Sequence, residues 1–227
     1  MEQHTIFFGL LRRRHFLAPT WRGCFLMVLS FAALLILAAH EVHPFLAVQD
    51  PVPGGVLVVE GWGADYAMEA AIAEFNRNHY DKVFVAGGVI DQGAPLCEYK
   101  TYAELGAATL AKLGLNTNAI QPVPAAWVRQ DRTYTAAATL KKWLRQHEMS
   151  PKKLNIVSVG PHARRSRLLF QKAFGKDVRI GVMAVPEKDY DPAHWWRSSA
   201  GVRATISELL AYGYARLIFN KPGSEPE

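Results

Sequence analysis

The feature that most constrains the fold is a short apolar run that ends in a glycine–proline turn and continues directly into a helical pattern. Leu154–Val159 is mostly apolar and β-branched, which predicts a buried strand of a parallel sheet. Gly160-Pro161 interrupts the run, and a helical pattern then extends from His162 to about Ala173. This order places His162 at the carboxyl edge of a sheet, where ligands bind in open α/β folds.

The same alternation of apolar runs and helical periodicity covers most of the chain. Further strands are predicted at 56–59, 83–86, 120–123 and 178–183, with helical segments between them and a long helix after Ser198 or Ser199. Pro122 and Pro124 confine the strand at 120–123 to an edge of the sheet. We therefore predict an α/β domain over 55–220, with three layers and helices on both faces of a parallel sheet, followed by a polar tail at 221–227.

The amino-terminal part has a different character. The 17 residues 23–39 contain no charge, and four arginines precede them in a basic arm at 1–22. This predicts one transmembrane helix with the amino terminus in the cytoplasm and the domain periplasmic or extracellular, joined by a tether at 40–54. A cleavable signal peptide is the alternative, although its charged region would be unusually long. A core helix is the third possibility, which the absence of polar interruptions disfavours.

The composition limits the kinds of ligand and partner that the chain is expected to bind. The net charge is +6, and 51–227 carry 22 Lys and Arg against 17 Asp and Glu, which suits an anionic ligand, a lipid surface or simply a soluble basic surface. No nucleic-acid-binding motif is present, so no nucleic-acid partner is expected. With only Cys24 and Cys97, we expect no disulfide within the domain and no paired-cysteine metal site. Neither phosphate-binding glycine fingerprint occurs, so no cofactor is expected.

Polar residues follow the predicted strands or open the predicted helices. Carboxyl ends of parallel strands meet at one edge, so we expect several of these residues to share a site. The candidates are Glu60, Gly87, Gly88, Asp131, Thr133, Gly160, His162 and Arg165. Simpler alternatives stay open: a solvated strand end for Glu60, a plain turn for the glycine pair, and helix caps for Asp131 and Thr133.

The helical spacing after Gly160 predicts which of these residues contact a ligand and which take part in proton transfer. His162 shares the inward face with Ser166, and Arg165 lies on the adjacent flank, so Arg165 and the amides after Gly160 are the predicted anion contacts. Arg164 and Arg167 are expected to be solvated. His162 is the candidate general acid or base, oriented by Asp131 or Glu60. The alternative is a capping histidine beside an arginine that only packs its stem.

The sequence also predicts structural roles for three other features. Trp195-Trp196 suits a core corner, a sugar-stacking lid together with Tyr190–His194, or a contact with the bilayer surface. Glu208, at the flank of the last helix, is placed to reach back to Arg165 or another arginine. Thr101 and Glu104 form a capping box, which explains Glu104 without any catalytic role.

At these residues the domain resembles the YdcF/SanA/ElyC-like family of bacterial envelope proteins. The resemblance covers about 55–217 and is carried by the first strand at 56–59, by 85–88, by the helix start at Thr133 and above all by 157–165, with Glu208 as a further matching position. It implies a Rossmann-like fold, an envelope role and a small anionic ligand. Thr135 and Ala136 stand where the family has Glu and Asn, and Glu60-Gly61-Trp62 replaces a glycine-rich turn.

Three functional hypotheses follow. The first is an enzyme that hydrolyses or transfers a phosphorylated or nucleotide-linked precursor in cell-wall or exopolysaccharide metabolism. The second is a non-catalytic envelope-integrity or assembly factor that uses the same pocket for a ligand or partner, which the missing Glu–Asn pair favours. The third, a nucleotide or S-adenosylmethionine binder in transfer chemistry, is disfavoured by the absent glycine fingerprint and the external location.

Overall fold

The computed structural model describes residues 5–6, 11–12, 20–91 and 93–220, and the chain divides into two compact units, Met1–Ala39 and His40–Glu227. The first unit contains a short antiparallel pair, β1 (Thr5–Ile6) and β2 (Leu11–Arg12), and most of helix α1 (Trp21–Leu46). The rest of the predicted arm and the predicted tail at 221–227 lie outside the described residues.

The helix α1 is long and apolar enough to cross a membrane. Its most apolar window has a mean hydropathy of 2.2, and none of that window is buried. A buried core helix is therefore the wrong description of this segment. Length and composition do not separate a membrane anchor from a signal sequence, because both are apolar helices near an amino terminus.

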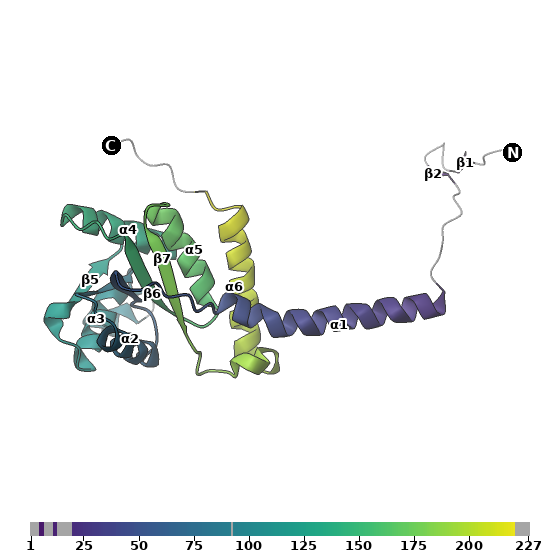
Figure 1. Cartoon of the computed structure of the whole chain (residues 1–227), viewed down its shortest axis with the longest axis horizontal. Coiled ribbons are helices and arrows are strands. Elements are labelled where there is room, and N and C mark those ends of the chain that lie inside the picture. The colour runs from purple at the N-terminus through teal and green to yellow at the C-terminus, as the bar shows by residue number, and fades with distance from the viewer. Residues whose placement is uncertain (1–4, 7–10, 13–19, 92, 221–227) are drawn as a thin grey trace. The chain divides into compact units, whose positions relative to one another are not determined.

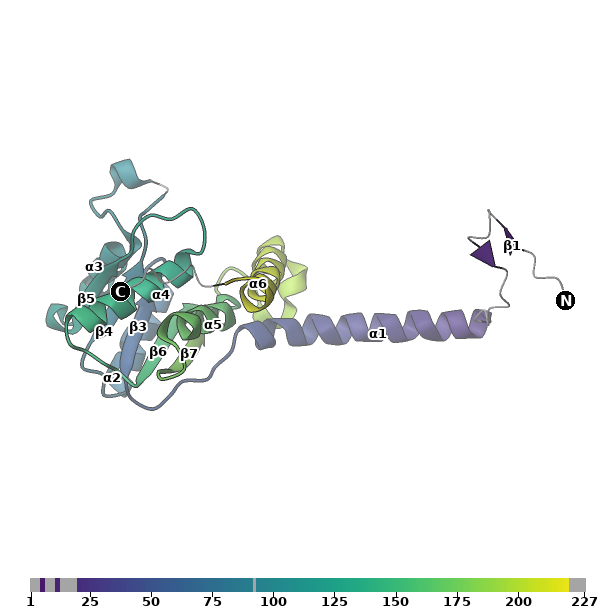
Figure 2. The ribbon, with the colours of Figure 1, turned by 90° about the horizontal axis from the view of Figure 1, so that it is seen from above.

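The second unit is built on a five-stranded parallel sheet, as predicted. Its strands are β3 (Val56–Glu60), β4 (Val83–Gly87), β5 (Ile120–Pro124), β6 (Lys153–Val159) and β7 (Arg179–Val185). Figure 1 labels β5, β6 and β7 of this sheet, and Figure 2 labels all five strands. All neighbours are parallel and the spatial order is β5-β4-β3-β6-β7. The proline-containing β5 is an edge strand, because proline cannot donate to a second ladder.

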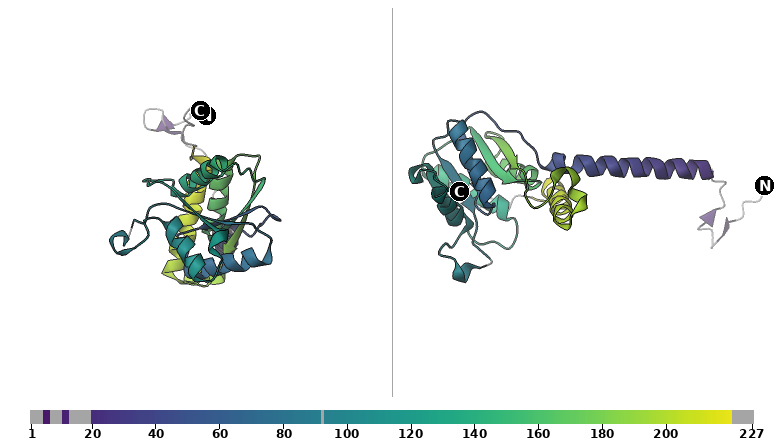
Figure 3. Two further views of the ribbon diagram at one scale, coloured as in Figure 1. Left: turned by 90° about the vertical axis from the view of Figure 1, so that its left-hand side faces the viewer. Right: turned by 90° about the horizontal axis from the view of Figure 1, so that it is seen from below.

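Helices cover both faces of the sheet (Figure 3). α2 (Asp65–Arg77) and α3 (Tyr102–Lys112) bury Met68, Ala71 and Leu110 against one face. α4 (Arg132–Gln146) and α5 (His162–Phe174) bury Leu140 and Phe170 against the other. The domain is thus a Rossmann-like three-layer α/β fold.

A final helix, α6 (Ser199–Leu217), lies beside α5 (Figure 2) and follows a short 3-10 helix, η3 (Pro192–Arg197). Ser198 caps it by accepting a hydrogen bond from the Gly201 N–H, which decides between the two predicted caps. Ala215 and Phe219 bury against Leu169 of α5. Two further 3-10 helices, η1 (Ala94–Leu96) and η2 (Thr117–Ala119), precede α3 and β5.

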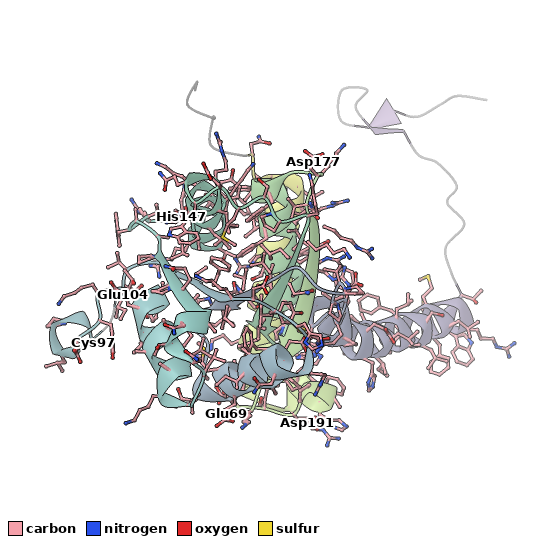
Figure 4. All side chains as sticks on the ribbon, turned by 60° about the vertical axis from the view of Figure 1, so that its left-hand side comes forward. Glu69, Cys97, Glu104, His147, Asp177 and Asp191 are labelled. Atoms are coloured by element: carbon pink, nitrogen blue, oxygen red, sulfur yellow. The ribbon has the colours of Figure 1, made fainter. Side chains whose placement is uncertain are left out.

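The predicted capping box at the start of α3 is confirmed. The Thr101 hydroxyl accepts from the Glu104 N–H at 3.2 Å, and the Glu104 carboxylate accepts from the Thr101 N–H at 2.9 Å. Figure 4 labels Glu104 here and Cys97 in the preceding loop. Glu104 is therefore explained by helix capping.

The connector at 40–54 differs from the predicted tether, because much of it packs on the domain. α1 continues through Pro44 to Leu46, and His43 and Leu46 are buried. Further along, the Asn155 amide donates to the Val52 carbonyl at 2.7 Å and its oxygen accepts from the Val52 N–H at 2.8 Å. A buried amide that satisfies a backbone donor and acceptor at once holds this segment against the sheet.

Two arginines of α5 hold the same connector, so the expectation that they are solvated is wrong. The Arg164 guanidinium donates to the Phe45 carbonyl and lies over the Phe45 ring at 3.9 Å from its centroid. Arg167 pairs with Asp50 at 2.7 Å and donates to the Ile180 carbonyl at 3.0 Å. The Arg164 side chain is thus covered by the connector, whereas Arg167 lies between the connector and strand β7 of the sheet.

Candidate functional site

Two neighbouring strands send their helices to opposite faces of the sheet. β3 leads into α2 on one face, and β6 leads into α5 on the other. Such a topological switch point opens a crevice at the carboxyl edge, where ligands of open α/β sheets bind. Glu60 is the last residue of β3 and His162 is the first of α5, so both flank this crevice.

A pocket of about 660 Å³ lies at this edge. It brings together seven of the eight predicted site residues, which come from four different segments of the chain. They are Glu60, Gly87, Gly88, Asp131, Thr133, His162 and Arg165. The eighth, Gly160, does not line the pocket; its φ is +47°, and it forms the turn into α5 while its N–H donates to the Val185 carbonyl.

Glu60 is a buried carboxylate with three polar neighbours. Its oxygens accept hydrogen bonds from Ser158 at 2.5 Å and Ser166 at 2.8 Å, and Oε1 lies 3.4 Å from His162 Nε2. Burial opposes its ionisation, but the charge of His162 and the hydrogen bonds outweigh burial and lower the pKa of Glu60. Because Glu60 is only 6% exposed, the alternative of a solvated strand end is wrong.

His162 lies between two carboxylates. Its Nδ1 lies 2.9 Å from Glu208 Oε1 and 2.8 Å from Arg165 Nη2, and its Nε2 lies 3.4 Å from Glu60 Oε1. Burial alone would lower the pKa of His162, but the Glu60 charge and the Glu208 hydrogen bond outweigh it and raise the pKa to about 9. The raised pKa favours the imidazolium form at neutral pH, in which the ring can act as a fixed cation or a proton donor.

Arg165 is held by the same carboxylate, as the position of Glu208 suggested. Its Nε donates to Oε2 at 2.7 Å and its Nη2 to Oε1 at 2.9 Å, a bidentate pair that ties α5 to α6. Burial raises the pKa of Glu208, but the hydrogen bonds from Arg165 and His162 outweigh burial and lower it to about 2. Two carboxylates and two cations form a neutral cluster, which we call the charge quartet: Glu60, His162, Arg165 and Glu208.

The opposite part of the pocket is formed by the start of α4. Asp131 has φ +58°, a left-handed conformation that non-glycine residues seldom adopt, and its side chain caps no N–H of the helix. Asp131 thus occupies the N-cap position of α4, but its carboxylate does not cap the helix. Among the described residues, no hydrogen bond or ion pair joins Asp131 to His162, so the predicted orienting role falls to Glu60 and Glu208.

The glycine pair separates into two roles. A Cβ at Gly87 would lie 2.7 Å from the Ala103 nitrogen, so this glycine is required by the close approach of α3 to the end of β4. A Cβ at Gly88 would meet nothing within 4 Å. Packing against α3 thus explains why residue 87 is a glycine, whereas the space around the Gly88 Cα is open and Gly88 lines the pocket.

Aromatic side chains complete the lining. Trp62 stands edge-on to the His162 ring at 4.9 Å between centroids and is 43% exposed, and Trp127 is 63% exposed. Trp195 and Trp196 do not line this pocket, nor do Tyr190–His194, so the lid stays a prediction. Trp195 is buried and Trp196 packs against His40.

The pattern analysis missed several members of this site. Ser158 lies inside an apolar strand, and the pattern singles out Ser166 only because it shares a helix face with His162. The signal that was available is that two hydroxyl side chains occupy buried positions facing the carboxylate at the end of a strand. Trp127 lies in a loop without periodicity and gave no signal. No group of three or more metal-ligating side chains occurs in the part of the chain that the structure describes.

Comparison of the chain with protein-family models, with curated proteins and with solved structures finds no match in any of the three. The resemblance to YdcF/SanA/ElyC-like proteins therefore stays a prediction that depends on the quoted motifs.

Proposed function

We propose that the domain at 40–220 binds a small phosphorylated molecule, of the sugar-phosphate or nucleotide type, at the carboxyl edge of its sheet. The observation that carries this proposal is a pocket in which a helix start, two exposed tryptophans and arginines meet at a topological switch point. Its volume of about 660 Å³ lies within the range of about 300–1,000 Å³ usual for small-molecule sites.

The phosphate is assigned to the first turn of α4. The first N–H groups of a helix have no intrahelical acceptor and attract anions. Arg129 and Arg132 line the pocket beside this turn, and Arg132 is already paired with Asp91 at 2.6 Å. Because Arg165 is bound by Glu208, Arg129 replaces Arg165 as the arginine proposed to contact the phosphate.

The uncharged part of the ligand is assigned to the tryptophans. Trp62 and Trp127 offer exposed faces on which a sugar ring or a base packs. The Asp131 carboxylate, which caps no helix N–H, is available to accept hydrogen bonds from sugar hydroxyls.

Binding without turnover is the form of the function that the geometry favours. Both nitrogens of His162 face carboxylates, Nε2 is shielded from solvent, and Glu208 holds the Nε and Nη2 of Arg165, so the quartet forms a fixed base of the pocket. A hydrolytic or transfer step is the second candidate. It is favoured by the pKa of His162, about 9, since a perturbed acid in a cleft is typical of catalytic sites.

We also propose that α1 anchors the chain in the cell membrane, with the amino terminus inside and the domain outside. The arginines before the span support this orientation, and the resemblance supports an envelope role. Retention of the full chain in carbonate-washed membranes is expected; release into the soluble fraction would contradict the anchor.

Calorimetry on the full chain in detergent micelles tests the binding proposal, with inorganic phosphate, glucose 1-phosphate and uridine monophosphate as probes. At least one probe is expected to bind, and Arg129→Gln is expected to weaken it by about tenfold, the effect of losing one charge-assisted hydrogen bond of about 1.4 kcal/mol. Arg179→Gln is the matched control, because it removes the same charge from the opposite edge of the sheet.

Two results would contradict the proposal: no heat from any probe, or equal weakening by both arginine substitutions. Product formation followed in the same samples separates the two candidates. Conversion of a bound probe that His162→Gln abolishes would favour the enzyme over the binding factor.

A further inference from the structure

The outer face of α6 is an uncovered apolar surface. Val202, Ile206, Leu210 and Leu217 recur at intervals of four, four and seven residues and are between 39% and 83% exposed. This spacing puts all four on one side of the helix. The opposite side carries Glu208, Ala215 and Gly201, which are turned toward the domain. We call the four-residue surface the α6 stripe.

The charges near this stripe have one sign. Within α6 the only charged residues are Arg203, Glu208 and Arg216. Glu208 points inward to the charge quartet, whereas Arg203 and Arg216 are exposed. Arg197, just before the helix, is exposed as well. An apolar stripe flanked by arginines, with no outward carboxylate on the helix, is typical of surfaces that bind anionic lipid.

The point at which the chain enters the domain lies against η3 and α6. The His40 ring contacts Trp196 at 4.7 Å between centroids, and Phe45 contacts Tyr212 of α6 at 5.7 Å. His40 directly follows the uncharged run that ends at Ala39. If this run spans the bilayer, one peptide bond separates the membrane from a residue packed on Trp196 of η3, and Trp196 lies at the depth where tryptophan is enriched.

From these observations we infer that the α6 stripe docks on the surface of the bilayer, with Trp196 and the arginines among the lipid headgroups. The inference rests on the proposed membrane anchor and adds to it: the domain is held against the membrane by α6 and not only by its covalent link. Since the inner side of α6 contributes Glu208 and Ala211 to the pocket, docking would place the pocket close to the headgroups.

Fluorescence quenching tests the inference on the full chain in phosphatidylglycerol vesicles. In a Cys24→Ala/Cys97→Ala background, single cysteines at Leu210, Leu113 and Leu29 are labelled with an environment-sensitive dye, and lipids carrying a quencher near the headgroup or deep in the tails are added. Leu113 lies at the end of α3, is 40% exposed, and is the matched control. Leu29, within the uncharged run, reports whether the anchor is inserted.

The headgroup quencher is expected to reduce the emission of the dye at Leu210 at least twofold more than at Leu113, and replacement of Arg203 and Arg216 by glutamine should reduce this difference. Quenching at Leu29 with none at Leu210 would overturn docking while leaving the anchor intact. Absence of quenching at Leu29 would overturn both. Disulfide formation between two copies at Leu210, without lipid quenching there, would identify a second copy as the occupant and would equally overturn docking.

Discussion

His162 makes the stability of the domain depend on pH in a predictable direction. Its pKa is raised from 6.5 to about 9, so its interactions with Glu60 and Glu208 contribute fully below pH 6.5 and are lost as the pH rises through about 9. A tenfold change in a protonation equilibrium corresponds to about 1.4 kcal/mol, so the free energy of unfolding should fall by about 3 kcal/mol across this window. Glu208, with its pKa lowered to about 2, contributes above pH 4.5 and loses this contribution only toward pH 2.

Thermal unfolding of the full chain in micelles between pH 6 and 10 measures this effect. The melting temperature should drop between pH 6.5 and 9, and the drop should vanish in His162→Gln. His79→Gln removes an exposed histidine and should leave it in place. If the melting temperature fell equally with pH in the wild type and in His162→Gln, the imidazolium would not be stabilised by its carboxylates.

The charge quartet should respond to single and paired substitutions in different ways. Glu208→Ala leaves two buried cations opposite one carboxylate and is expected to destabilise the domain by about 3–5 kcal/mol. Glu208→Leu combined with Arg165→Met removes one charge of each sign and should cost much less, since a buried ion pair is often replaceable by apolar side chains. Chemical denaturation of both variants provides the comparison.

Glu69→Ala serves as the control, because it removes an exposed carboxylate on α2 (Figure 4). If Glu208→Ala were as mild as Glu69→Ala, or if the double variant were no more stable than Glu208→Ala, the quartet would not be a coupled unit.

At the scale of elements, the contact between the end of β4 and the start of α3 depends on one glycine of a pair. Gly87→Ala would push a methyl group against the Ala103 backbone and is expected to cost about 1–3 kcal/mol, as overpacking typically does. Gly88→Ala enters open space at an ordinary φ and should leave the melting temperature unchanged. Equal melting temperatures for the two variants would mean that α3 can shift away from the strand.

The sequence predicted strands, helices and the sheet edge well, because each depends on local periodicity and turn residues. Val56–Val59 is a continuous apolar run, Lys153–Val159 is rich in apolar β-branched residues, and the Gly160 turn determines where α5 begins. The connector was mispredicted because prolines and glycines indicate an irregular segment without saying what it packs against. Its attachment depends on Asn155, about 100 residues away, and on arginines of α5.

At the scale of the whole molecule, seven of eight predicted site residues share one pocket because parallel strands end at one edge. The sequence pattern could not predict which charged side chains pair with each other in the fold. Arg165 and His162 looked available to an anion, but Glu208 of α6 and Glu60 of β3 hold them. Pairing between distant segments is a property of the folded chain, and here it moves the proposed phosphate from α5 to α4.

The most direct measurement of the central claim is a crystal structure of the full chain soaked with glucose 1-phosphate. We predict the phosphate within hydrogen-bonding distance of the Thr133 backbone nitrogen and the Arg129 side chain, with the sugar against Trp62 or Trp127. A phosphate that instead displaces Glu208 from Arg165, or density for the ligand only outside this pocket, would contradict the account.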